Sequence, residues 1–159
     1  MRGICVARAS GDPERLPVKA GRRARPHYEE AVGIVRRRDG RYLIARRPER
    51  GLLGGLWELP GGRLEPGEAL GGCCVRGVRE EVGAKVRAVE RFRSVNHAYT
   101  HFSVTIHAFY CTYISGRVRP LRCIEVAWVR PEEMRAYAFP RAHRRLTEGL
   151  GQGGEGLFT

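Results

Sequence analysis

The feature that most constrains this chain is a run of regularly spaced residues from Gly62 to Ala84. Gly62 is followed after five residues by Glu68, and Glu68 after seven by Arg76. The run then continues without a gap through Gly77, Val78, Arg79, Glu80, Glu81, Val82, Gly83 and Ala84. This run joins a glycine pair, Gly61-Gly62, to a segment with two adjacent carboxylates, Glu80 and Glu81.

The second half of this run has the pattern of a helix over residues 68–82. Its apolar residues recur at helical spacing, and Gly83 is placed to end it: the apolar positions are Leu70, Cys74, Val78 and Val82. Three glycines inside the segment each cost about 1 kcal/mol relative to alanine. We therefore expect this helix to depend on tertiary packing or on a ligand.

The helix pattern places carboxylates where they can bind a cation. Positions 77, 80 and 81 are spaced i, i+3 and i+4, so they project from one face, and Glu80 and Glu81 occupy two of them. Mg²⁺ binds through a few carboxylates together with substrate phosphates. Arg76 is four residues before Glu80 and can orient it, and Glu68 has a similar role at the helix start. A solvated helix face is the alternative for Glu80 and Glu81 alone.

The complete run resembles the Nudix box, in which Gly, Glu, Arg-Glu, a hydrophobe, Glu-Glu and Gly stand at these offsets. The resemblance implies an α+β Nudix fold, a mixed β-sheet sandwiched between α-helices. It implies Mg²⁺ or Mn²⁺ held by Gly61, Glu80 and Glu81, with Glu80, Glu81, Arg76 and Glu68 as catalytic residues. Arg46 and Arg47 would lie near the phosphates, and water would attack a phosphorus of a diphosphate.

One position departs from this family pattern. The Glu of the Arg-Glu pair is Gly77 here. Hydrolysing members use that Glu in metal binding or in activating water, and loss of a general base typically costs about 10² to 10⁴ in rate. Hydrolysis is therefore uncertain from the sequence, although Glu80 and Glu81 could keep a residual metal site.

Further segments resemble the C-terminal domain of the MutY family of adenine DNA glycosylases, which recognises 8-oxoguanine. They are Arg46-Arg47-Pro48, residues 51–60 with the sequence GLLGGLWELP, His97-Ala98-Tyr99-Thr100-His101, and Ala136-Tyr137-Ala138-Phe139-Pro140. In that family the aromatic, hydroxyl and His turn, here Tyr99, Thr100 and His101, contacts the lesion. A hydroxyl donates and accepts hydrogen bonds while an aromatic ring wedges between bases. A strand-entry turn is the alternative.

Cys5 and the segment that follows it resemble the end of the glycosylase catalytic domain, where the last ligand of an iron–sulfur cluster stands. A lone Cys cannot hold such a cluster, so no intact iron–sulfur cluster is expected. The adenine-excising residues and the helix-hairpin-helix domain are missing from this sequence. A separate glycosylase catalytic chain is therefore a candidate partner.

The rest of the sequence predicts one domain with two extensions. Residues 1–28 are interpreted as a basic arm or linker remnant, 29–148 as the Nudix domain, and 149–159 as a flexible Gly-rich tail. Strands are predicted at 31–37 and 42–46 around the hairpin dipeptide Asp39-Gly40, at 101–114 in the centre of the sheet, and at 125–129. Short helices are predicted at 131–137 and 141–150, and loops at 51–55 and 60–62.

Charge and cysteine content limit the possible partners and the cellular compartment of the protein. The net charge of +12 favours a polyanionic partner, but with only two Lys against 27 Arg it is equally explained by GC-rich coding bias. Five Cys without a CxxC pair argue against a disulfide framework or a zinc site, and Cys73, Cys74 and Cys111 are predicted to be buried thiols. No apolar run is long enough for a membrane span. We expect a cytoplasmic protein.

Two functions follow from these observations. The favoured one is recognition of 8-oxoguanine in DNA during oxidative damage repair. The alternative is a Mg²⁺-dependent Nudix hydrolase that cleaves oxidised nucleoside triphosphates such as 8-oxo-dGTP. Gly77 is the residue that discriminates between these two functions. A non-functional gene fragment is a third interpretation, which the Gly-rich helix favours.

Overall fold

The computed structural model describes residues 25–51, 53–148 and 150. The predicted arm up to residue 24, which includes the Cys5 segment, and all of the predicted tail except Leu150 lie outside these described residues. The elements in chain order are β1 (His27–Arg36), β2 (Tyr42–Arg46), β3 (Trp57–Glu58), β4 (Gly61–Arg63), α1 (Leu70–Val82), β5 (Lys85–Ala98), β6 (Ser103–Ser115), β7 (Glu125–Val129), the 3₁₀ helix η1 (Pro131–Ala136) and α2 (Arg141–Thr147).

The strands form one mixed sheet that is divided near its middle. β1 pairs in parallel with β6, and β6 pairs antiparallel with β5, so β6 is the central strand that its alternating sequence predicted. β1 meets β2 beside the hairpin, with Arg36 opposite Tyr42, whereas further along β1 pairs with β4 and β2 pairs with β3 and β7. This change of partners separates β1 from β2 and leaves room between them.

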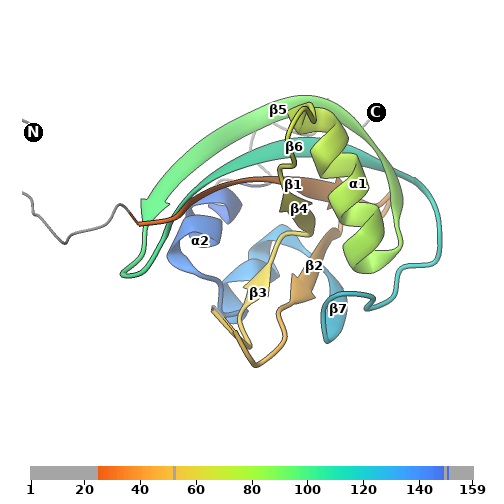
Figure 1. Ribbon diagram of the computed structural model, residues 1–159. Helices are drawn as coiled ribbons and strands as arrows, with labels where there is room; N and C mark the ends of the chain where they lie inside the picture. The colour runs from red at the N-terminus through yellow and green to blue at the C-terminus, as the bar shows by residue number, and fades with distance from the viewer. Residues whose placement is uncertain (1–24, 52, 149, 151–159) are drawn as a thin grey trace, which may run out of the picture.

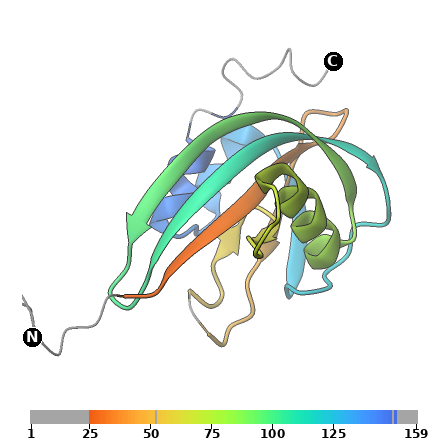
Figure 2. The same ribbon diagram turned by 45° about the horizontal axis from the view of Figure 1, so that its top comes forward.

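Helices cover both faces of the sheet, as predicted. α1 lies on one face of β1 and β6, and α2 lies on the other, which Figures 1 and 2 show from two directions. Alternate residues of β1 and β6 therefore enter two separate cores: Val32, Ile34, Ile106 and Leu146 belong to the α2 side, and Ala31, Val35, Cys111 and Val78 to the α1 side. Burial of both faces is what fixes the register of these strands.

Helix α1 follows the predicted apolar pattern and ends where the sequence indicated. Cys73, Cys74, Val78 and Val82 are buried against the sheet. Gly83 adopts φ 78°, and its N–H donates to the Arg79 carbonyl, which is the usual left-handed end of a helix. Cys74 Sγ lies 3.5 Å from Cys111 Sγ. Cys73, Cys74 and Cys111 are buried, as predicted, and Cys123 is a further free, buried cysteine.

The structure differs from the sequence prediction in its elements as well as in some of their ends. β1 begins at His27, inside the predicted arm, because residues 27–30 pair with β6. The predicted loop at residues 60–62 contains the short strand β4, which pairs with β1. The predicted helix at 131–137 is a 3₁₀ helix, η1. β5, a strand of 14 residues, had no prediction at all.

Candidate functional site

The space between the diverging strands β1 and β2 is a cavity of about 320 Å³. Its walls come from six parts of the chain that meet there: β1, the end of β2, β3, β4, α1 and the loop before β7. The lining residues with charged side chains are Glu30, Arg47, Glu58, Arg63, Glu65, Arg76, Glu80, Glu81 and Arg122. Carboxylates and guanidinium groups therefore line the same cavity, beside the glycine backbone of Gly61 and Gly62.

Glu81 is the most deeply placed carboxyl group of this cavity. Its residue is only 7% exposed, and its Oε1 accepts a hydrogen bond of 3.0 Å from the Gly61 N–H. Its carboxyl group also shares a hydrogen bond with Glu58. Burial, and then the neighbouring charge of Glu58, raises the pKa of Glu81 well above its ordinary value. Glu81, which the sequence predicted to be a metal ligand, thus lies in this cavity.

Arg76 and Glu68 fix the loop before α1 to the helix. Arg76 Nε and Nη2 reach the two carboxylate oxygens of Glu68 at 2.6 and 2.9 Å, and Nη1 reaches Glu80 at 3.0 Å. The Arg76 guanidinium holds the pKa of Glu68 down at about 2. Arg122 adds a second guanidinium contact to Glu80, at 3.2 Å. The sequence predicted that Arg76 orients Glu80, and this contact is present.

The two neighbouring arginines at the end of β2 have different surroundings. Arg47 lines the cavity, where its Nη1 donates to Glu58 at 2.8 Å. Arg46 does not line it; its Nε donates to the Gly55 carbonyl at 3.0 Å, and its guanidinium also lies near Glu49 and Glu125. Because successive residues of an extended chain point to opposite sides, one of the pair is available to a ligand in the cavity.

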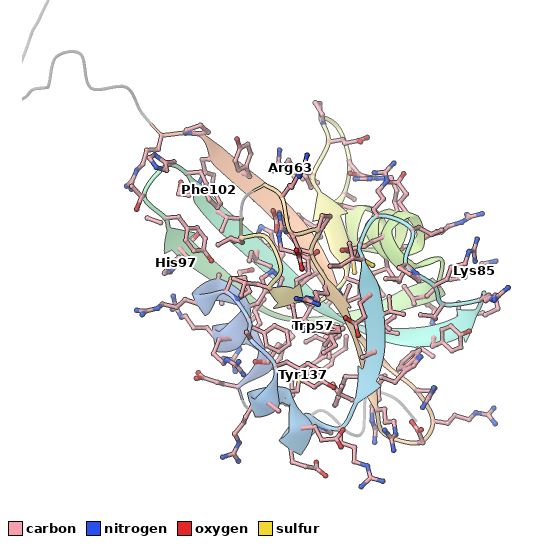
Figure 3. The ribbon with its side chains drawn as sticks, turned by 90° about the horizontal axis from the view of Figure 1, so that it is seen from below. Trp57, Arg63, Lys85, His97, Phe102 and Tyr137 are labelled. Atoms are coloured by element: carbon pink, nitrogen blue, oxygen red, sulfur yellow. The ribbon has the colours of Figure 1, made fainter. Side chains whose placement is uncertain are left out.

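A narrow apolar slot of about 30 Å³ adjoins the cavity and shares Glu30, Arg47, Glu58 and Arg63 with it. Its other walls are Leu53, Tyr99, Phe102, Val104, Ile106, Pro140 and His143. The rings of Tyr99 and Phe102 stack at 4.7 Å, and the Arg63 guanidinium lies 3.8 Å above the Tyr28 ring. Phe102 and His97 lie at the opposite end of the molecule from Lys85 (Figure 3).

His143 provides a fixed hydrogen-bond donor beside this slot. It is 4% exposed, and its Nδ1 accepts a hydrogen bond of 3.2 Å from the Leu59 N–H. Burial lowers the pKa of His143 to about 4, so the ring is neutral at pH 7 and its proton resides on Nε2. No partner for this Nε2–H is found among the described residues. A buried donor of this kind favours a ligand that brings an acceptor.

The turn that resembles the lesion-recognition motif is only partly at this site. Tyr99 lines the slot, whereas Thr100 and His101 are exposed in the turn between β5 and β6 and do not line it. Glu30, Glu58, Arg122 and His143 line the cavity or the slot but were not assigned roles from the sequence. Glu58 directly precedes Leu59-Pro60-Gly61-Gly62, which was a usable signal; Arg122 and His143 stand in no recognisable pattern.

The cavity suits a divalent cation that is completed by a substrate. Among residues 25–51, 53–148 and 150, no three His, Cys, Asp or Glu side chains are gathered tightly enough to enclose a metal ion. Mg²⁺, however, is usually held by one or two protein carboxylates plus water and substrate phosphates. Glu58 and Glu81, two carboxyl groups in contact within the cavity, meet that requirement.

A mixed sheet between helices, with the carboxylate-bearing helix α1 packed against the Gly61–Gly62 backbone, is a Nudix fold. The family model for the NUDIX domain matches residues 31–149, and the chain belongs to this family of Nudix hydrolases. Nudix hydrolases generally use Mg²⁺ or Mn²⁺.

Named relatives agree with this assignment. The CTP pyrophosphohydrolase of Escherichia coli (strain K12) is 31% identical over 121 residues, which are 76% of this chain and 90% of the relative. The 8-oxo-dGTP diphosphatase of Proteus vulgaris is 32% identical over 82 residues, 52% of this chain and 73% of the relative. The solved MutT protein from Methanosarcina mazei Go1 is similar with a TM-score of 0.74 and 27% identity, covering 82% of this chain and 97% of that one.

The described residues also contain no helix that is long and apolar enough to cross a membrane.

Proposed function

We propose that this protein is a Nudix pyrophosphohydrolase that cleaves nucleoside triphosphates to the monophosphate and diphosphate. The observation that supports this most directly is the cavity lined by the carboxyl groups of Glu58 and Glu81, the guanidinium groups of Arg47 and Arg63, and the Gly61–Gly62 backbone. A divalent cation bound there would neutralise phosphate charge and stabilise charge that develops during hydrolysis. The departure at Gly77 does not remove every carboxylate from the cavity, so hydrolysis is compatible with the sequence.

In this proposal the phosphates of the substrate bind in the cavity and its nucleobase binds in the slot. Arg47 and Arg63 line both spaces, so their guanidinium groups can bind the phosphates that leave the slot and enter the cavity. The nucleobase would enter between Tyr99, Phe102 and Pro140 after these side chains move apart, because the slot is narrow. His143 Nε2–H would then donate to a ring nitrogen or carbonyl of the base.

Two classes of nucleobase, a cytosine and an oxidised guanine, fit this proposal. The relatives are named for CTP and for 8-oxo-dGTP, and both bases offer acceptors to a single donor such as His143. Recognition of 8-oxoguanine within DNA, the function favoured by the sequence, receives less support. The relatives are named as hydrolases, and Thr100 and His101 do not line the slot.

The test is diphosphate release from CTP, dCTP, 8-oxo-dGTP and dGTP with Mg²⁺. We expect turnover of at least one of these nucleotides, and we expect Glu81→Gln to lower it by about 10² or more, because the buried carboxylate is lost. Glu90→Gln, an exposed carboxylate on β5, is the matched control and should keep full turnover. No release by the native protein with either Mg²⁺ or Mn²⁺ would refute the proposal.

A further inference from the structure

Position 77 has no room for a side chain in this structure. α1 places Gly77 directly against β4, and a Cβ built on it would lie 2.3 Å from the Gly62 nitrogen and 2.4 Å from the Gly61 carbonyl carbon. Both atoms belong to backbone, which cannot turn aside as the end of a flexible side chain can. A carboxylate at position 77 would therefore require α1 and β4 to separate, so a carboxylate that replaces the one absent there must come from another position.

Glu58 brings a carboxyl group to the same place from a different direction. It lies in β3, opposite Ala45 of β2, and its side chain is 13% exposed. The side chain lines the cavity together with Glu81 and shares a hydrogen bond with it. Arg47 contacts Glu58 from the other side at 2.8 Å. Glu58 is thus a second carboxyl group beside Glu81, contributed by the sheet and not by the helix.

Glu80, the other carboxylate of the helix motif, has different partners. It is bound by the guanidinium groups of Arg76 at 3.0 Å and Arg122 at 3.2 Å. It is also more exposed, at 38% for the side chain. A carboxylate already neutralised by two cations attracts a third cation less strongly than one that faces another carboxylate. The electrostatics of the cavity therefore favour Glu58 over Glu80 as the partner of Glu81.

We propose that Glu58 takes the place of the carboxylate that is absent at position 77, and that Glu58 and Glu81 together hold the divalent cation of the proposed hydrolase. Two carboxylates in contact repel each other unless a proton or a cation lies between them. A pair of carboxylates, with water and substrate phosphates, is the usual complement for Mg²⁺. This assignment rests on the proposed function for its biological role, but it is testable without turnover.

The test is the affinity of the protein for Mn²⁺ in the absence of nucleotide. Binding is measured as the decrease in the electron paramagnetic resonance signal of free Mn²⁺. The proteins are the native chain, Glu58→Gln, Glu81→Gln, Glu80→Gln and the control Glu65→Gln, whose exposed carboxylate lines the rim of the same cavity. We expect Glu58→Gln and Glu81→Gln to weaken Mn²⁺ binding at least about tenfold. Glu80→Gln and Glu65→Gln should stay within about threefold of the native chain, because two guanidinium groups already neutralise Glu80 and the Glu65 side chain is exposed to solvent.

Two results would overturn the proposal. The first is native-like Mn²⁺ affinity in a folded Glu58→Gln, which would make Glu58 a partner of Arg47 alone; a loss in Glu80→Gln would then assign the cation to Glu80 and Glu81. The second is a native chain that binds no Mn²⁺ at millimolar concentration. If circular dichroism shows that Glu58→Gln is unfolded, Glu58→Asp replaces it, because it keeps the charge but withdraws it by one methylene; Mn²⁺ affinity equal to that of the native chain would then refute the role.

The outcome is separate from that of the turnover test. A native chain that binds Mn²⁺ through Glu58 but releases no diphosphate would refute the proposed function and leave the ligand assignment standing. Turnover that survives in Glu58→Gln with unchanged Mn²⁺ affinity would leave the proposed function standing and refute the assignment.

Discussion

At the scale of single residues, His143 shows how burial converts an ordinary titratable side chain into a fixed donor. Its ring is enclosed between α2 and the end of β3, and the Leu59 N–H occupies Nδ1. The nearest charges that affect it are Glu58, which favours the protonated ring, and Arg47, which opposes it. Burial outweighs both, so the ring stays neutral and offers Nε2–H toward the slot.

This gives a prediction about stability and pH. The pKa of His143 is about 4 in the folded protein, below its ordinary value of 6.5, so the unfolded chain binds the proton more tightly. The contribution of the neutral His143 ring to the free energy of unfolding is therefore complete above pH 6.5 and is lost as the pH falls through 4. We expect the native protein to lose about 3 kcal/mol of unfolding free energy over this range relative to His143→Asn, measured by urea denaturation.

Asn is the suitable replacement because its side-chain oxygen can still accept from the Leu59 N–H while nothing titrates. Taking the difference between the two proteins removes the pH dependence of every group that they share. Parallel curves for the two proteins between pH 7 and pH 4 would show that His143 does not control this dependence.

At the scale of elements, α1 contains two glycines beside open space and one glycine that is packed tightly against β4. A Cβ at Gly71 or Gly72 would meet no atom within 4 Å, whereas one at Gly77 would overlap the backbone of β4. The exposed glycines reduce helix stability without any packing benefit, while Gly77 permits the close approach of α1 to the Gly61–Gly62 backbone. The same residue type therefore has two effects in one helix.

Alanine substitutions separate these effects. Gly72→Ala should stabilise the protein by about 1 kcal/mol through helix propensity. Gly77→Ala should destabilise it by about 1 to 3 kcal/mol, because overlap with fixed backbone outweighs the same propensity gain. Thermal and urea unfolding of both variants would check this, with Gly72→Ala as the matched control; equal stabilisation by both would mean that α1 and β4 are not in contact at Gly77.

At the scale of the whole molecule, the net charge of +12 favours binding to any polyanion, which is different from specific recognition of a damaged base in DNA. Arginines that attract a polyanion do so without regard to base identity, and such binding weakens steeply with salt. A hydrolase that accepts free nucleotides through the slot has no need to distinguish damaged from undamaged duplex DNA.

Fluorescence anisotropy with duplexes that contain 8-oxoguanine opposite adenine, or an ordinary G·C pair, would test this distinction. We expect equal affinities for the two duplexes, and a fall of more than about tenfold between 50 and 200 mM salt, because any binding is driven by phosphate contacts. A preference of tenfold or more for the damaged duplex at 200 mM salt would instead support lesion recognition through Tyr99, Thr100 and His101.

The sequence by itself determined the features that depend on near neighbours in the chain. The i, i+3 and i+4 spacing placed Glu80 and Glu81 on one helix, Arg76 was predicted to orient Glu80, and Gly83 was predicted to end the helix; each is present. The alternation of β6 predicted the central strand for the same reason. β5 escaped prediction because its register shifts at three places, which breaks the alternation that identifies a strand.

The tertiary structure decided which distant residues meet. Glu58 joins Glu81 because β3 pairs with β2 at the point where β2 has left β1, and His143 meets Leu59 across 84 residues of sequence. It also separated Arg47 from Arg46 by placing one of two adjacent guanidinium groups in the cavity. Helix and strand periodicity is local and can be read along the chain, whereas these contacts depend on how strands pair and helices pack.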